Sequence, residues 1–357
     1  MKLLNRYILR QLIGASLFTL VALLGLYLFF DIMSEISKLG QGNYNTATMF
    51  LYLALLLPGH AYELMPLAVL IGGMVAMTQL ASHSEYTVIR TSGVSNKQIA
   101  TLLIKFGLGF AILTALLGEV LVPISEQKAE RVHLRAVESN VSASFKSGIW
   151  IKDNLNIINV GEMLPDNSLK QLRMYEHSAD NQLKMVASAD SGTYNQDGTW
   201  DLNNVKVSRL EEDRVVVENH ATLHINSAIN PKLLSVLLVK PEQMSVANLD
   251  EYIDHLEANK QKTQRYRIAF WSKFFYPLAC ISMALVALAF TPQQRRGGSL
   301  GTRLFLGICL GVGFNFTNRF FSFLGQLYDW NALLSATLPT LVFLLAGVWM
   351  IRRQERR

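Results

Sequence analysis

The sequence predicts an α-helical membrane protein with six transmembrane helices and an all-β domain inserted between helices 3 and 4. Half of the 357 residues are apolar and the mean hydropathy is +0.24, too high for an ordinary soluble protein. The apolar residues also gather in six long runs. Three runs lie on either side of a polar stretch in which apolar and polar residues alternate.

The first three apolar runs are each long enough to cross a bilayer. A helix rises 1.5 Å per residue, so about 20 residues span the roughly 30 Å hydrocarbon core. The runs cover residues 12–33, 51–80 and 99–124, and the third continues as a charged helix. Prolines within the second run predict kinks. Residues 1–135 would therefore form membrane helices 1 to 3.

Residues 82–93 predict a short helix between the second and third runs. Ser82 and Glu85 have the spacing of a capping box, and Gly93 can adopt the left-handed conformation that ends a helix. Ser95 and Gln98 repeat the capping box before the third run. The helix would dock on a partner through a small apolar surface edged by an acid, made of Glu85, Val88, Ile89 and Ser92, with Arg90 elsewhere. The alternative is a turn resting on lipid headgroups.

Residues 140–240 predict an all-β domain. Apolar residues recur at every second position, as in Ile149 and Ile151 or Val205 and Val207. Turn signals such as residues 195–198 separate the alternating segments. Short alternating strands of this kind are typical of a sandwich or a jelly roll.

Residues 241–357 would form a connecting helix and membrane helices 4 to 6. Ser245 can cap the connecting helix. Apolar residues then follow the i, i+3, i+4, i+7 spacing of a helix that packs on one face, namely Leu249, Tyr252, Ile253 and Leu256. The last three apolar runs cover residues 268–290, 304–324 and 332–351.

The distribution of positive residues predicts the orientation. With the N-terminus in the cytoplasm, most short-loop lysines and arginines are cytoplasmic, and the short outer loops contain only Lys38. The β domain would then lie outside. The net charge of +6 therefore needs no nucleic acid partner. Cys280 and Cys309 lie within apolar runs and cannot form a disulfide framework. The sequence has no phosphate-binding loop, so nucleotide chemistry would belong to a partner.

Ionisable residues within the spans are costly, and Arg319 and Lys273 are two of them in the later spans. Arg319 could hold an anionic headgroup through paired hydrogen bonds, or could pair with Glu119 or Asp31. Lys273 is expected to extend its amine toward the membrane surface. No catalytic grouping or metal-ligand set is found in the sequence.

A second basic group lies near the outer end of the first span. Arg131 and Arg135 share one helix face at i, i+4 spacing, close to Lys38. Together these side chains could bind phosphates. They could equally be surface charges paired with nearby carboxylates.

Several motifs connect the chain with a known family: Gly40-Gln41-Gly42-Asn43-Tyr44, Ser84-Glu85, Ser92-Gly93, Gly118-Glu119, Trp271-Ser272-Lys273 and Pro277-Leu278. With these motifs the chain resembles the lipopolysaccharide-export permeases, half-transporters of an ABC system in Gram-negative inner membranes. The resemblance spans nearly the whole chain. It is closer to the G-type than to the F-type members.

The resemblance implies a pair with an F-type permease subunit, enclosing a cavity for lipopolysaccharide. An ABC ATPase dimer, holding ATP and Mg²⁺, would dock on the short helix with Glu85 in its groove. This chain would hold no cofactor and carry no catalysis. The β domain would be a periplasmic jelly roll that passes the lipid to a single-span adaptor (LptC-like) and a bridge protein (LptA-like). Lys38 would hold a lipid phosphate, whereas Ser37 and Asp31 stand where other members place lysine.

Two other functions are compatible with the residues. An ion-coupled transporter could use Glu63, Glu119 and Asp31 as a proton relay. A membrane-anchored periplasmic binding protein would recognise its ligand with the β domain and would not need Glu85. The capping boxes around Gly93 favour the exporter, because a loop without a partner has little need of a defined helix.

Overall fold

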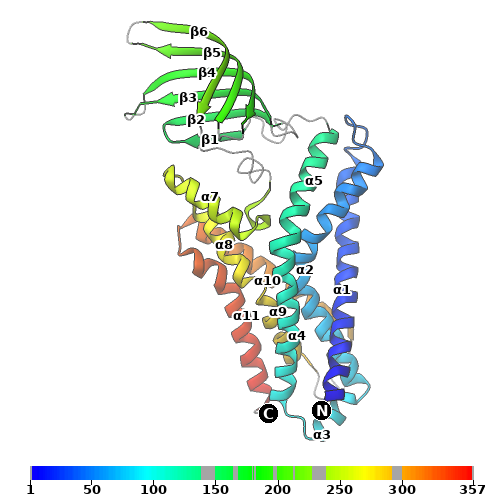
Figure 1. Cartoon of the computed structure of the whole chain (residues 1–357). Coiled ribbons are helices and arrows are strands. Elements are labelled where there is room, and N and C mark those ends of the chain that lie inside the picture. Colours follow the sequence, from blue (N-terminus) through cyan, green and yellow to red (C-terminus); the bar gives the residue numbers. More distant parts are fainter. Residues whose placement is uncertain are drawn as a thin grey trace.

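The computed structural model describes residues 2–137, 149–163, 168–178, 180, 182–195, 199–211, 214–226, 239–291 and 300–355. Figure 1 shows a bundle of long helices with a β-sheet at one end. Both termini and the short helix α3 (Glu85–Thr91) lie at the other end. The sheet and the short helix α3 therefore lie at opposite ends of the helix bundle.

The first half of the bundle is built around α2 (Thr46–Ser82). Its most apolar 18-residue window is 83% buried, whereas that of α1 (Lys2–Ile36) is 17% buried, so α2 is the central helix. Both predicted kink sites, Pro58 and Pro66, lie within this one helix. A π-helical turn η1 (Leu117–Leu121) joins α4 (Asn96–Leu116) to α5 (Val122–Val137), and together they form one long span.

The second half contains a broken span. α8 (Gln264–Phe275) and α9 (Ala279–Ala289) meet at an angle of 55°. The predicted single helix over residues 268–290 is therefore wrong, because this segment forms two helices. Pro277 has no backbone N–H and its ring excludes a regular preceding turn, which accounts for the break.

Two long helices complete the bundle, α10 (Leu300–Leu327) and α11 (Ala332–Glu355). Among the described helices, four are long and apolar enough to cross a membrane, and the α8–α9 pair would make a fifth. The predicted fifth run forms α10, which is not among them. Asn315, Asn318 and Arg319 lower the hydropathy of its second half.

Glycines allow the helices to approach closely. A Cβ added at Gly72 of α2 would lie 2.6 Å from the backbone nitrogen of Ser16 on α1. A Cβ added at Gly107 of α4 would lie 2.7 Å from Cα of Ile281 on α9. Such small residues are typical of membrane helix interfaces.

The inserted domain is a single six-stranded antiparallel sheet of β1 (Ile149–Asp153), β2 (Asn156–Met163), β3 (Leu169–His177), β4 (Leu183–Tyr194), β5 (Thr199–Leu210) and β6 (Val215–Asn226). The predicted all-β domain is confirmed. Its strands pair in sequence order, so the described part is a meander without the crossover of a jelly roll or sandwich. Connections of two to five residues favour pairing between sequence neighbours.

The alternating apolar residues line one face of the sheet. Ile151, Val160, Leu172, Trp200 and Val205 are all buried there. Figure 1 shows the sheet strongly curved. The curvature lets a single sheet surround its own apolar face.

The connecting helix α7 (Val246–Ala258) forms as its spacing predicts. Ser245 caps it by accepting a hydrogen bond from Asn248 N at 3.2 Å. Its four predicted apolar residues are buried. Asn259, just beyond its end, accepts a hydrogen bond from Asn154 N at 2.6 Å, which links α7 to the turn between β1 and β2. α7 therefore lies between the bundle and the sheet.

Candidate functional site

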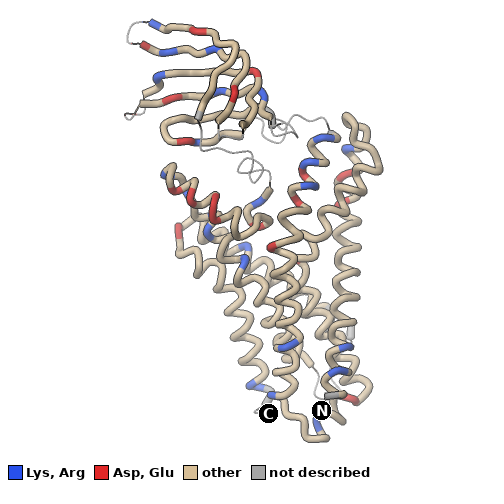
Figure 2. Tube along the Cα trace, viewed as in Figure 1, with Lys and Arg blue, Asp and Glu red and all other residues tan. Residues whose placement is uncertain are grey.

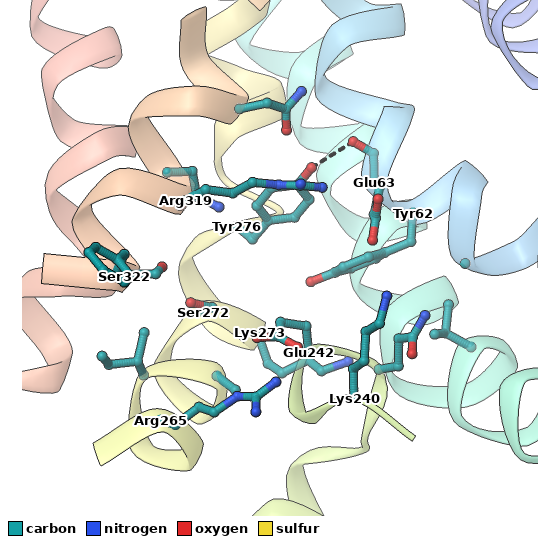
Figure 3. Close-up of a pocket in the computed structure, with 18 of the residues that line it drawn as sticks. Tyr62, Glu63, Lys240, Glu242, Arg265, Ser272, Lys273, Tyr276, Arg319 and Ser322 are labelled. Carbon is teal, nitrogen blue, oxygen red and sulfur yellow. Dashed lines mark hydrogen bonds between the residues drawn. The ribbon is translucent and has the colours of Figure 1, made fainter. Parts of the chain in front are cut away.

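A pocket of about 380 Å³ opens beside α10, close to the segment that leads into α7. Residues from α2, α5, α8, α10 and the segment around η3 (Pro241–Gln243) line it. Figure 3 shows Arg319 of α10 and Arg265 of α8 extending into it, with Lys240 reaching in from the segment before η3. The pocket thus brings together side chains from segments far apart in the sequence.

Positive charge dominates the pocket. Four cations line it, Lys240, Arg265, Lys273 and Arg319, together with two carboxylates, Glu63 and Glu242. Among the described residues, no carboxylate lies within salt-bridge distance of Lys240, Arg265 or Arg319. All three are exposed, so their charge is available to an anion.

Lys273 has a different environment from the other three cations. Only 8% of the residue is exposed, and its Nζ donates to the carbonyl of Gly118 at 3.0 Å. It also lies 5.2 Å from the ring centre of Tyr62, a cation–π distance. In the π-helical turn the N–H of Val122 bonds to Leu117 O, and the following Pro123 has no N–H, so the Gly118 carbonyl can accept from the lysine. The prediction that Lys273 extends toward the surface is therefore wrong, because its amine is held inside the bundle.

Aromatic residues support this wall of the pocket. Tyr62 and Tyr276 have ring centres 5.1 Å apart, and the Tyr276 hydroxyl donates to the carbonyl of Glu63 at 2.7 Å. Gly118 makes room for the Tyr62 ring, since a Cβ there would lie 2.8 Å from Cδ2 of Tyr62. These contacts fix α2, η1 and α8 relative to one another.

Glu119 joins η1 to the connecting helix. Its two carboxylate oxygens accept from Val246 N at 3.0 and 3.1 Å, at the first turn of α7. A carboxylate at a helix N-terminus is favourable because it satisfies a free N–H and complements the helix dipole. The suggested pairing of Arg319 with Glu119 or Asp31 is not formed, since Asp31 lies 2.7 Å from His60 Nε2.

The predicted basic group at the end of α1 lies apart from the pocket. Lys38 Nζ is 2.7 Å from Glu35 Oε1, and the buried Glu35 also accepts from Tyr44 OH at 2.9 Å. Burial, together with the bond to Glu35, raises the pKa of the Tyr44 hydroxyl, which therefore remains a donor. Arg131 is half-buried and Arg135 exposed on α5. None of Lys38, Arg131 and Arg135 lines the pocket that holds Arg319.

The short helix α3 differs from its prediction at its start. Ser82 is the last residue of α2, and its hydroxyl donates to Gln79 O at 2.9 Å. The predicted capping box of Ser82 with Glu85 is therefore not formed. The helix begins at Glu85 after Ser84, whose left-handed φ of 64° turns the chain. Because Ser82 remains within the long helix and its hydroxyl bonds to the preceding turn, its side chain does not cap the helix that follows.

The C-terminal end of α3 agrees with the sequence. Gly93 has the predicted positive φ of 93°, and the capping box of Ser95 with Gln98 is formed. Val88 is 64% exposed and Arg90 is exposed. Ile89 lies in the bundle core instead.

Glu85 is half-buried and has a partner within the chain. Its Oε2 accepts from the Tyr7 hydroxyl of α1 at 2.9 Å. The residue therefore ties α3 to the first membrane helix.

The sequence indicated Arg319 and Lys273 as ionisable residues of the spans, but not Lys240 or Arg265, which line the same pocket. Lys240 and Arg265 carry no local pattern, and they meet Arg319 only through the tertiary fold. A local signal was nevertheless present on α10. Its pocket-lining polar residues recur at helical spacing: Asn315, Asn318, Arg319, Ser322 and Gln326.

Comparison with known proteins gives the family. The profile of the family described as lipopolysaccharide export system permease LptF/LptG matches residues 6–353. The chain is 28% identical over 353 residues to the lipopolysaccharide export system permease protein LptG of Haemophilus influenzae, with 99% of both chains covered. It is 28% identical over 357 residues to the protein of that name from Escherichia coli K12, covering 99% of this chain and 98% of that one. A family match over almost the full length shows that this chain belongs to the LptF/LptG permeases.

Proposed function

We propose that the chain is the transmembrane subunit of an ABC transporter that extracts lipopolysaccharide from the inner membrane and passes it to a periplasmic bridge. The observation that carries the proposal is the placement of two features at opposite ends of the bundle. A short helix with exposed residues lies at one end, and a cation-lined pocket beneath a curved β-sheet lies toward the other. Family membership supplies the substrate.

The short helix α3 is the proposed contact with an ABC ATPase dimer. Val88 and Arg90 are exposed there, and Glu85 is half-buried beside them. Because the sequence has no phosphate-binding loop, ATP and Mg²⁺ would be bound by the ATPase. This subunit would then transmit a conformational change without catalysing a reaction.

An F-type permease subunit is the proposed neighbour within the membrane. Large apolar side chains are exposed along α1 and α10, among them Phe18 (77%) and Phe316 (70%). Exposed apolar side chains of this kind on membrane helices contact either lipid or another membrane protein. A paired subunit along these faces would enclose a cavity between the two chains.

The β domain is proposed to lie in the periplasm. Figure 2 shows lysines and arginines at the end of the bundle that holds both termini. Positive residues mark the cytoplasmic side of a membrane protein, so the opposite end would be periplasmic. There the sheet would pass the lipid to an LptC-like adaptor and an LptA-like bridge protein. Its apolar face would cover the acyl chains, whose exposure to water costs about 25 cal/mol per Å².

The ATPase contact can be tested by co-purification. The tagged chain should recover an ABC ATPase from its native membrane, and Glu85→Ala should reduce the recovery while thermal stability is kept. Thr87→Ala is a matched control, because Thr87 is exposed on the same helix. Failure of the unmodified chain to recover any ATPase would contradict the ABC assignment.

A further inference from the structure

We propose that the pocket beside α10 binds a phosphorylated sugar headgroup, with the phosphate held by Arg319, Arg265 and Lys240. This inference rests on the proposed function and names the part of the lipid bound at this site. It adds a second phosphate contact, distinct from the basic group predicted at the outer end of α1, where Lys38 is paired with Glu35.

Three exposed cations face a concave pocket and, among the described residues, none has a carboxylate within salt-bridge distance. Like charges gathered in one cavity repel one another unless an anion binds between them. Two of the three are guanidinium groups, whose planar N–H groups can hold a phosphate through paired hydrogen bonds.

Lys273 is excluded as a direct contact. Its amine donates to Gly118 O and lies over the Tyr62 ring, so an anion would have to break both contacts to reach it. Its charge still adds to the positive potential of the pocket. Lys273 is therefore a positioning residue that holds η1 and α8 together.

One face of α10 is polar where it lines the pocket. Asn315, Asn318, Ser322 and Gln326 line the pocket at helical spacing in an otherwise apolar helix. Polar side chains within a membrane helix are costly unless they find polar partners. Amides and hydroxyls suit sugar hydroxyl groups, because each can donate and accept. The pocket therefore fits a headgroup better than acyl chains.

Lys240 comes from a different part of the chain than the two arginines. It lies on the segment that returns from the β domain, whereas Arg265 and Arg319 lie on membrane helices. A phosphate bound by all three would connect the bundle with the base of the β domain. The site thus lies between the helix bundle and the base of the β domain.

Binding can be measured by photocrosslinking in nanodiscs that contain the chain with its assembled partners. A photoreactive residue replacing Ser322 should crosslink to diphosphorylated lipid A, and crosslinking should fall with the fully dephosphorylated lipid. Arg319→Gln and Arg265→Gln should each weaken the apparent affinity about tenfold, in line with loss of a charge-assisted hydrogen bond. Arg319→Lys should restore part of it.

Arg267→Gln is the matched control. Arg267 lies on α8 two positions from Arg265, but it is bound to Glu257 and does not line the pocket. Equal affinities for Arg319→Gln and Arg267→Gln would overturn the proposed site. Displacement of the crosslink by millimolar inorganic phosphate would overturn the headgroup and indicate a free-phosphate site.

ATP hydrolysis measured in the same nanodiscs distinguishes failure of the proposed site from failure of the proposed function. If lipid A stimulates ATP hydrolysis equally in the unmodified chain and in Arg319→Gln, the export function stands and this pocket does not bind the lipid phosphate. If the unmodified assembly neither binds lipid A nor responds to it, the proposed function itself fails.

Discussion

Gly72→Ala should separate α1 from the rest of the bundle. Gly72 is buried on α2 and faces Ser16 of α1, which is also buried. An added Cβ would lie 2.6 Å from Ser16 N and closer still to Ser16 Cα. These are backbone atoms, so no side-chain rotation can relieve the clash.

The expected cost follows from this distance. Non-bonded carbon atoms prefer separations of about 3.5–4.0 Å, so the two helices would have to move apart by roughly 1 Å or more. Overpacking of this kind typically costs about 1–3 kcal/mol. We expect the upper part of that range, because Ile8 and Leu12 of α1 are buried in the same core and would lose contacts.

The assay is reversible unfolding of the detergent-solubilised chain, with each variant compared under identical conditions. Gly14→Ala on α1 is the control, because a Cβ there meets nothing within 4 Å. That change should be neutral or stabilise the helix by up to about 1 kcal/mol. Ser16→Gly should not rescue Gly72→Ala, since the backbone clash remains. Equal stability of Gly72→Ala and Gly14→Ala would refute this packing of α1 on α2.

Three further predictions concern the two ends of the bundle. Glu119→Ala should raise amide hydrogen exchange at Val246 about tenfold, through loss of roughly 1–2 kcal/mol of capping, whereas unchanged exchange would contradict the role of this carboxylate. Gly93→Ala should cost about 1 kcal/mol from its positive φ and lower ATPase recovery, and full recovery would indicate that the turn after α3 is unimportant. Lys38→Ala or Arg131→Glu should reduce lipid-stimulated ATP hydrolysis more than basal hydrolysis; equal loss of both would indicate a folding role.

Local signals in the sequence identified most of the elements. The spacing of the apolar residues of α7 and the alternation in the β domain each depend on neighbouring residues alone, and both patterns are confirmed. The second capping box, at Ser95, formed because no other helix includes that residue. The first did not, because α2 extends to Ser82.

Interactions between distant segments could not be predicted from such patterns. The break between α8 and α9 has a local cause, Pro277. It was not predicted because the residues on both sides of this proline form one apolar run. Lys273 and Gly118 are far apart in sequence, and their contact depends on the π-helical turn. The pocket needs α2, α8 and α10 together with residues that follow the sheet, so only its polar face on α10 was visible in the sequence.

The way the β domain is attached to the bundle makes it a module. Gln243 donates to Glu126 at 2.9 Å, and Val246 to Glu119 at 3.0 Å, so the returning chain is bound to the helix from which it left. The closed junction lets the membrane helices keep their arrangement without help from the inserted strands. Insertions between neighbouring chain ends are well tolerated. The sheet can therefore diverge, or be exchanged for that of a relative, while the bundle and its pocket are preserved.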